Sequence, residues 1–329
     1  MGRFLNIGII QMPVTADTAE NFRFLEEKVD NLMKSYHKPE LVLGVESIAS
    51  FTPDTIPGRI TGYFSSIAKK HGIYFIPGTI SEKSDELSEN IFYNTAVVFN
   101  PDGKLIAKYR KMAPWRPAEQ FSAPGNQYCV FDIPEKDTHI GLQICYDLNF
   151  PEISRNETLM GAEVLIKLTM DPQELYLLNK HIHYTRALEN QAYLVSTNGT
   201  GFFNAINLYG NSLVISPEGN VLCEAGQTPC AFTVTLDLDL VKRCRQKGTM
   251  FMDHYLKHLY EYNFPAPFAS DLRSAPVFED LNKAPVSPEE YDENISDIFE
   301  NPIGKRAPKD VNTEQLERNL SEFLSSRKF

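Results

Sequence analysis

The chain has 329 residues, of which 42% are hydrophobic and 11% aromatic, so it is long enough to bury a large core as one α/β domain or two smaller ones. Its formal net charge of −11 argues against a nucleic-acid partner, because binding phosphates requires a basic face. No uninterrupted apolar run reaches the roughly 18 residues that cross a bilayer, so no membrane-spanning segment is predicted.

The cysteines and the N-terminus indicate the compartment. The five cysteines (positions 129, 145, 223, 230 and 244) are an odd number without a C-x-x-C pair, so neither a disulfide framework nor a zinc site is expected. The N-terminal apolar run is short and lacks a small-residue cleavage site, which favours a buried first strand over a signal peptide. We therefore expect a cytoplasmic protein.

In chain order, short apolar runs alternate with segments of helical periodicity. Strands are predicted at Phe4–Met12, Leu41–Val45, Tyr74–Ile80, Tyr93–Phe99, Lys104–Tyr109, His139–Ile144, Val164–Leu168, Tyr193–Thr197, Leu213–Ser216, Asn220–Glu224 and Phe232–Leu238. Helices are predicted at Thr18–Lys34, at Tyr63–Lys70, from Pro151 to Gly161 and at Pro172–Ala192. The turns "NPDGK" and "SPEGN" each join two strands into a hairpin, so mixed sheets covered by helices are expected.

The composition changes after about residue 263, where proline and acidic residues become frequent and periodicity is lost. We expect an extended arm there, followed by a short amphipathic helix with Leu316, Leu320, Phe323 and Leu324 on one face. Asn312 and Gln315 are spaced like a capping box at its start. This helix is expected to pack on its own domain or on a neighbouring subunit.

One cysteine has an unusual position. Cys145 follows the apolar strand of "HIGLQICYDLNFPE" and precedes a helix, where backbone N–H groups and the helix dipole favour a thiolate. Free cysteines are also among the most buried residues, so an inert core thiol is the alternative. The histidines offer no obvious base: His181 and His183 are expected on the surface of a long helix, facing different sides.

Two charged residues also end strands. Glu46 ends "LVLGVE", and Lys111 follows "LIAKYR". Each alone is most simply a solvated strand terminus, but strand ends are where α/β sheets commonly place chemistry. A lysine beside Cys145 is expected to lower the pKa of its thiol.

Together these stretches resemble the nitrilase (carbon–nitrogen hydrolase) superfamily, whose members share a Glu–Lys–Cys triad in this chain order. The resemblance covers most of residues 4–240 and rests on Glu46 and on four stretches: "YNTAVVFNPDGKLIAKYRK", "GLQICYDLNFPE", "RALENQAYLVSTN" and "GNSLVISPEGNVL". "KMAPWRPAEQF", with Trp115 and Glu119, looks like the aliphatic amidase and formamidase branch. Val45 stands where members usually have proline before the glutamate.

The resemblance implies a fold, namely a four-layer α-β-β-α sandwich of two mixed sheets, over residues 1–262, with residues 263–329 as a C-terminal arm. It also implies a thiol amidase that acts on small aliphatic amides such as formamide, without a metal or cofactor, and that assembles as a homo-oligomer.

The resemblance further implies roles for individual residues. Cys145 would be the nucleophile and Glu46 the base and acid. Lys111 and the backbone N–H of Tyr146 would bind the oxyanion. Three residues would support them: Glu119 would orient Lys111 or the substrate amide, Trp115 would wall the pocket, and Asp147 would contact substrate or hold the backbone of the turn.

Two other functions remain open. An N-carbamoyl amidohydrolase or a nitrilase would use the same triad on another bond. A binding or scaffold protein would keep the fold without catalysis.

Overall fold

The computed structural model describes residues 2–203, 206–249, 251–262, 264–278, 285–290 and 313–326. Its strands are β1 (Phe4–Pro13), β2 (Leu41–Asp54), β3 (Tyr74–Glu82), β4 (Phe92–Phe99), β5 (Leu105–Arg110), β6 (Ser122–Ala123), β7 (Val130–Ile133), β8 (Thr138–Ile144), β9 (Val164–Thr169), β10 (Tyr193–Phe203), β11 (Ile206–Tyr209), β12 (Leu213–Ile215), β13 (Val221–Glu224) and β14 (Cys230–Asp237). Its helices are α1 (Thr18–Lys34), α2 (Arg59–His71), α3 (Pro151–Leu159), α4 (Tyr176–Asn190), α5 (Leu238–Lys247), α6 (Tyr255–Tyr262) and α8 (Thr313–Ser325).

The strands form two mixed halves joined at one point. In the order β5-β4-β3-β2-β1-β10-β9-β8-β7, strands β1, β2 and β3 run parallel, as do β8, β9 and β10. The outer pairs β3–β4, β4–β5 and β7–β8 are antiparallel. The two halves are joined by strand pairing where β1 lies beside β10, with Met12 opposite Gly199 and Pro13 opposite Thr200. The α/β class expected from the sequence is confirmed.

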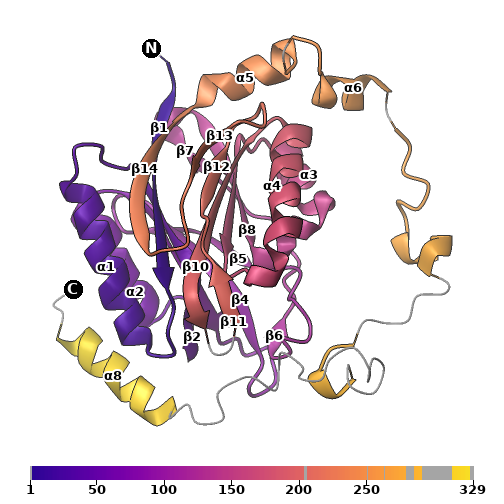
Figure 1. The fold of residues 1–329 in the computed structure, drawn as a ribbon. Coiled ribbons are helices and arrows are strands. Elements are labelled where there is room, and N and C mark those ends of the chain that lie inside the picture. Colours follow the sequence, from indigo (N-terminus) through magenta and orange to yellow (C-terminus); the bar gives the residue numbers. More distant parts are fainter. Residues whose placement is uncertain are drawn as a thin grey trace.

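Three apolar clusters show how the layers stack. The first lies between the two halves of the sheet and combines β1 and β2 with β8 and β9, for example Ile7 and Leu41 with Ile140 and Ile166. The second packs α1 and α2 against the outer face of β1–β4, and the third packs α4 against β9 and β10. Figure 1 shows α1 and α2 on one side of the strands and α3 and α4 on the other. Strands covered on both faces explain why the predicted strands are nearly continuous apolar runs.

Helix α1 begins and ends where the periodicity predicts. The Asp17 carboxylate accepts hydrogen bonds from the N–H groups of Ala19 and Glu20, at 2.9 and 3.2 Å, and so caps its N-terminus. The sequence patterns do not predict β6, β7, β11, α5 and α6. Strand β2 also extends nine residues past its predicted end at Val45, to Asp54.

The C-terminal helix α8 packs on its own chain. Leu320, Phe323 and Leu324 are buried in the same cluster as α1 and α2, as the amphipathic pattern predicts. Arg59 of α2 pairs with Glu317, and Figure 1 shows α8 beside the lower end of α1. Of the two alternatives for this helix, the structure shows contact with its own domain. The capping position Asn312 lies outside the described residues.

Among the described residues, no helix is both long enough and apolar enough to span a bilayer.

Candidate active site

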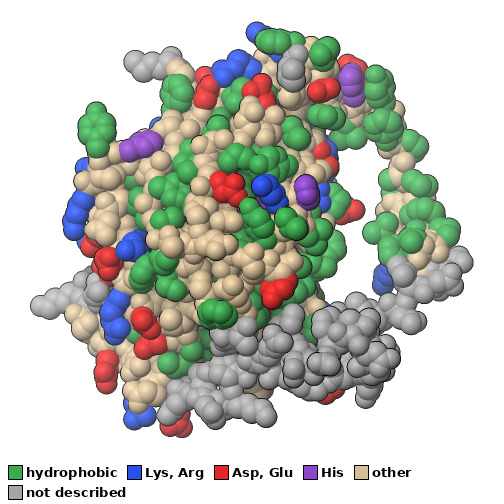
Figure 2. All heavy atoms as spheres, viewed as in Figure 1, with side chains coloured by type: hydrophobic (Ala, Val, Ile, Leu, Met, Phe, Trp, Pro, Cys, Tyr) green, Lys and Arg blue, Asp and Glu red, His purple; other side chains and the backbone are tan. Residues whose placement is uncertain are grey.

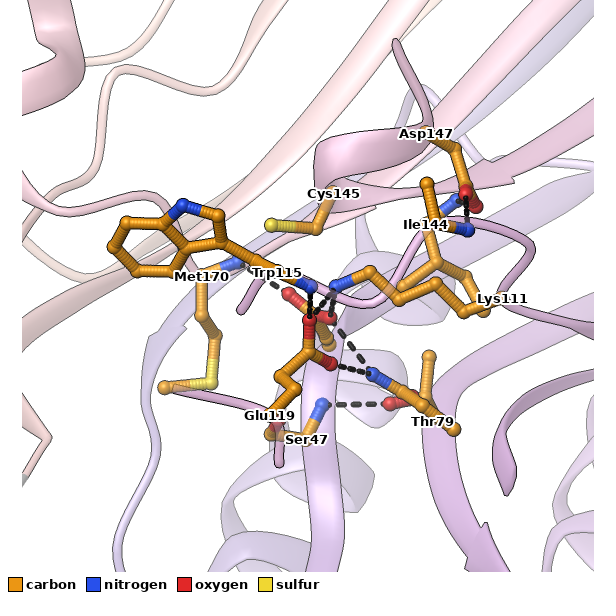
Figure 3. A network of polar contacts seen from close by, with 12 residues as sticks. Ser47, Thr79, Lys111, Trp115, Glu119, Ile144, Cys145, Asp147 and Met170 are labelled. Carbon is orange, nitrogen blue, oxygen red and sulfur yellow. Dashed lines mark hydrogen bonds and ion pairs between the residues drawn. The ribbon is translucent and has the colours of Figure 1, made fainter. Parts of the chain in front are cut away.

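Cys145 lies at a sharp turn between β8 and α3. Its φ of 51° is in the left-handed region, which residues other than glycine rarely occupy, and a short 3₁₀ turn over Cys145–Asn149 follows. Only 8% of Cys145 is exposed. The turn directs the sulfur towards the side of the site where Trp115 and Met170 lie (Figure 3). A backbone held in this conformation points to a nucleophile more than to an inert core thiol.

Asp147 holds this turn in place. Its side chain is completely buried, and Oδ2 accepts hydrogen bonds from the Tyr109 hydroxyl at 2.8 Å and the Ile144 N–H at 3.0 Å. Oδ1 accepts a third from the Ala113 N–H at 2.7 Å. Figure 3 shows the carboxylate beside Ile144 and away from Trp115. These contacts match the role of holding the backbone, and Asp147 is not among the described residues that line the cavity.

Glu46 and Lys111 form a buried ion pair near the Cys145 side chain. Glu46 is 4% exposed and Lys111 1%, and Lys111 Nζ donates to Glu46 Oε1 at 2.9 Å. The second oxygen, Oε2, accepts the backbone N–H of Met170 at 3.0 Å. Both oxygens of the carboxylate are therefore fixed by partners from distant parts of the chain.

A second carboxylate, Glu119, shares the same ammonium group. Its Oε2 accepts from Lys111 Nζ and from the Trp115 N–H, both at 2.6 Å. Asn94 Nδ2 links the two carboxylates by donating to Glu46 Oε1 at 2.9 Å and to Glu119 Oε1 at 3.0 Å. Figure 3 shows these contacts as one network next to Cys145. The ammonium is thus held in one position between two acceptors.

The protonation states follow from burial and from neighbouring charge. Burial first, and then Glu46, raise the pKa of the Cys145 thiol well above its usual value and outweigh Lys111. Burial also raises the pKa of Glu46, which makes it a stronger base. For Lys111, burial opposes the charge, but Cys145, Glu119 and Glu46 raise its pKa well above the usual value. The expectation of a lowered thiol pKa is therefore wrong for the free enzyme, because the sulfur is more deeply buried than a strand end implies.

These groups open onto one cavity of about 500 Å³. Charged and reactive groups in its lining are Glu46, Lys111, Glu119 and Cys145, and the neutral polar lining residues are Ser47, Ser50, Ser81, Asn90, Asn94, Gln120 and Ser122. Its large apolar lining residues are Phe51, Phe92, Trp115, Phe121, Met170, Phe203, Ile206 and Leu208. Trp115 thus lies on the cavity wall, where the sequence interpretation placed it. Tyr146 does not line the cavity; its ring packs edge-on against Phe150, so only its backbone can serve the site.

Comparison with known proteins identifies the family. The profile of the carbon-nitrogen hydrolase family matches residues 6–246. The chain belongs to this family. The resemblance to the nitrilase superfamily is therefore confirmed, and the protein is a carbon-nitrogen hydrolase.

The alignments with relatives of this carbon-nitrogen hydrolase span most of each relative's length. Omega-amidase NIT2 of Homo sapiens is 29% identical over 270 residues, which is 74% of this chain and 93% of the relative. Omega-amidase NIT2-B of Xenopus laevis is 32% identical over 209 residues, 59% and 72% of the two chains. The crystal structure of Saccharomyces cerevisiae Nit3, a member of branch 10 of the nitrilase superfamily, superposes with a TM-score of 0.68 at 25% identity, covering 74% of this chain and 94% of that one.

Some residues of this carbon-nitrogen hydrolase site were not found from the sequence. Asn94 lies within a stretch quoted for the resemblance, yet its bridging role depends on two carboxylates 48 and 25 residues away. Lys167 is a lysine inside an apolar strand, which is a signal that sequence reading can detect. It pairs with Asp171, whose carboxylate reaches Cys145.

One sequence interpretation of this region is wrong. His183 is not on the surface but 1% exposed, because α4 turns it inward, where Nε2 contacts Ser196 Oγ at 3.2 Å. No cluster of three or more potential metal ligands occurs among the residues that the structure describes, and metal independence stays a prediction.

Proposed function

We propose that the protein hydrolyses neutral amides with an apolar acyl chain, through a thioester on Cys145. The observation that supports this proposal is the cavity, whose lining combines the Cys145 thiol, the Glu46 carboxylate and the Lys111 ammonium group with large apolar side chains. A small number of polar groups in a mostly apolar pocket is typical of a small-molecule site.

The reaction begins when Glu46 takes the thiol proton and Cys145 Sγ bonds to the amide carbon. The oxyanion accepts hydrogen bonds from Lys111 Nζ and the Tyr146 N–H, and each donor of this kind is typically worth on the order of 10²–10³ in rate. Glu46 then gives the proton to the amine, so that ammonia leaves and a thioester remains. Finally Glu46 takes a proton from water, whose oxygen attacks the thioester carbon. The C–S bond then breaks, Glu46 returns the proton to the sulfur, and the carboxylic acid leaves.

The charges at the cavity suggest the substrate class. Among the described lining residues, the only cation is Lys111, and it already pairs with two carboxylates. An amide substrate that also carries an ionised carboxylate would bring that charge into the cavity without a free cation among the described lining residues, which is costly. The volume also exceeds what formamide needs, so a longer acyl chain is favoured over formamide. The two curated relatives described above are omega-amidases by name, and the lack of a free cation in this lining is the reason to expect a neutral substrate here.

The test is ammonia release from matched substrates. We expect kcat/KM for hexanamide to exceed that for adipamate, which has the same chain length and a terminal carboxylate, by about 10²-fold, the cost of one unpaired charge. Preference for adipamate would show that the substrate class is wrong. Preference for an N-carbamoyl amino acid or for butyronitrile would support the alternative reactions instead. Activity should survive EDTA, and loss restored by zinc would contradict the metal-free mechanism.

We also propose a homo-oligomer, as the family resemblance implies, with contacts through the helices near Cys145. Large apolar side chains are exposed at the end of α3 and the start of α4, namely Leu159, Met160, Leu177 and Leu178. Figure 2 shows hydrophobic side chains gathered on the face that carries α4. Light scattering of the purified protein should give a mass above that of one 37.3 kDa chain, and a monomer would contradict this proposal.

A further inference from the structure

A second buried ion pair lies next to the nucleophile, outside the cavity. Lys167 of β9 and Asp171, just after this strand, are 1% and 3% exposed. Lys167 Nζ donates to Asp171 Oδ2 at 2.5 Å. Neither residue lines the cavity. A charged pair at this depth is expensive to bury, so its place beside a reactive sulfur calls for a physical reason.

The Asp171 carboxylate contacts the nucleophile directly. Its Oδ1 lies 3.5 Å from Cys145 Sγ, within the range of a hydrogen bond from the thiol. Its Oδ2 also accepts from the Tyr209 hydroxyl at 3.0 Å, and its backbone N–H donates to Asn198 Oδ1 at 2.9 Å. These partners come from β9, β10 and β11, so they fix the carboxylate independently of Glu46 and Lys111.

We propose that Lys167 and Asp171 form a positioning pair for the nucleophile: Asp171 accepts the Cys145 S–H in the resting enzyme and aims the sulfur, and Lys167 balances the Asp171 charge so that the thiolate can form beside it. This inference rests on the proposed function of Cys145 as the nucleophile. At attack, the thiol proton passes to Glu46, the S–H···Oδ1 hydrogen bond is lost, and Asp171 remains ionised throughout.

The proton goes to Glu46 because Asp171 is the weaker base. Burial opposes the charge on Asp171, but Lys167 and several hydrogen bonds lower the pKa of its carboxyl to about 2. Burial raises the pKa of Glu46 instead. Asp171 therefore accepts a hydrogen bond from the S–H group without taking the thiol proton. Lys167 affects the thiol by keeping the Asp171 carboxylate ionised.

The two charges of the pair act on the thiol in opposite directions. The titratable or charged groups around it are Glu46 of β2, Lys111 after β5, Glu119 behind Lys111, Lys167 and Asp171 from the β9 side, Tyr209 of β11 and His183 of α4. Burial first, and then Lys167, lower the pKa of His183 to about 3, so this group stays neutral. Removing the Asp171 charge leaves Lys167 unbalanced and favours the thiolate. Removing the Lys167 charge leaves Asp171 unbalanced and disfavours it.

The experiment measures the rate at which iodoacetamide alkylates Cys145, quantified on the peptide that carries it. At a fixed pH below the pKa of the thiol, this rate follows the thiolate fraction, so turnover is not needed. A charge within about 4–6 Å shifts a pKa by roughly one unit or more, so we expect about tenfold faster alkylation in Asp171→Asn and about tenfold slower alkylation in Lys167→Met. The double variant should return towards the wild-type rate. Shifts in the same direction, or no shift in either folded variant, would overturn the proposal.

Each charge variant leaves one buried charge unpaired, which destabilises the fold, so a milder variant is included. Tyr209→Phe removes one donor from Asp171 and keeps the ring that packs on Tyr176. Asp171 then accepts the S–H more strongly, and alkylation should slow about two- to fivefold. Tyr193→Phe is the matched control, since this buried tyrosine donates to the Asp237 carbonyl at 3.0 Å, and its alkylation rate should be unchanged.

Equal rates in Tyr209→Phe and Tyr193→Phe would overturn the proposal even where the charge variants do not fold. If the alkylation rates shift as expected but the protein hydrolyses no amide, the proposed function is refuted, while the effect of Lys167 and Asp171 on the Cys145 thiol is still supported.

Discussion

Replacement of Glu119 by glutamine tests whether the second carboxylate serves the reaction or only the fold. The side chain is 19% exposed, and its Oε2 accepts from Lys111 Nζ and the Trp115 N–H while Oε1 accepts from Asn94. Glutamine has the same shape but one acceptor fewer and no charge. We expect Glu119→Gln to lower turnover far more than stability.

The magnitude follows from the contacts. A charge-assisted hydrogen bond contributes about 1.5–3 kcal/mol and a neutral one about 1 kcal/mol, so the Lys111 contact loses about 0.5–2 kcal/mol. The glutamine N–H₂ group must also face a donor, either Asn94 Nδ2 or the two donors at Oε2, which costs about another 1 kcal/mol. The total of about 1.5–3 kcal/mol corresponds to a roughly 10- to 150-fold lower kcat/KM.

The assay compares ammonia release and urea unfolding in the variant and in a matched control. Glu163 is 14% exposed and pairs with Arg3 at 2.9 Å and with Thr138 Oγ1 at 2.7 Å, far from the cavity. Glu163→Gln should lose stability of a similar size and keep wild-type kcat/KM. If Glu119→Gln also keeps kcat/KM within about threefold of wild type, Glu119 is only a structural ion-pair partner and the reasoning is refuted.

Three further outcomes are expected. Burial raises the pKa of Glu157 to about 8 from an ordinary 4.5, so its contribution to stability is complete below pH 4.5 and is lost as the pH rises through 8. Between pH 5 and 9 the free energy of unfolding of the wild type should therefore fall by a few kcal/mol more than that of Glu157→Gln. Equal changes of the urea midpoint in the two proteins would contradict this. Burial raises the pKa of Glu46, the base, so the acid limb of kcat/KM should lie above pH 4.5, and a limb at or below that value would exclude Glu46 as the base. Phe323→Ala in α8 removes a buried ring that packs edge-on against Tyr63 at 5.3 Å and should cost about 3–5 kcal/mol without changing kcat; unchanged stability would show that α8 does not stabilise the domain.

The elements that sequence reading identifies are those with strong local periodicity. Helix α1 is predicted to the residue because Phe22, Leu25 and Val29 recur at helical spacing, and the structure adds the Asp17 cap at its start. Strand β7 is only four residues long and alternates weakly, so nothing local separates it from a loop. Its partner β8 stabilises it through antiparallel pairing, which is a tertiary contact.

The same division applies to the site. Glu46, Lys111 and Cys145 could be predicted because each ends a recognisable strand and because their order resembles a known family. For Asp147 the sequence left two roles open, since the backbone-holding contacts depend on Tyr109 and Ala113 coming together beneath the turn. The pKa of the thiol was mispredicted for a similar reason: the depth of burial belongs to the whole fold and not to the strand end.

The central claim is that Cys145 carries the acyl group as a thioester, and trapping that intermediate tests it most directly. The enzyme is mixed with excess hexanamide, quenched in acid during turnover, digested and analysed by mass spectrometry. The account predicts a hexanoyl group on the peptide that contains Cys145, and neither adduct nor hydrolysis in Cys145→Ala, which should fold normally because few atoms are removed. Turnover without any acylated peptide, acylation at another residue, or near-normal hydrolysis by Cys145→Ala would contradict it.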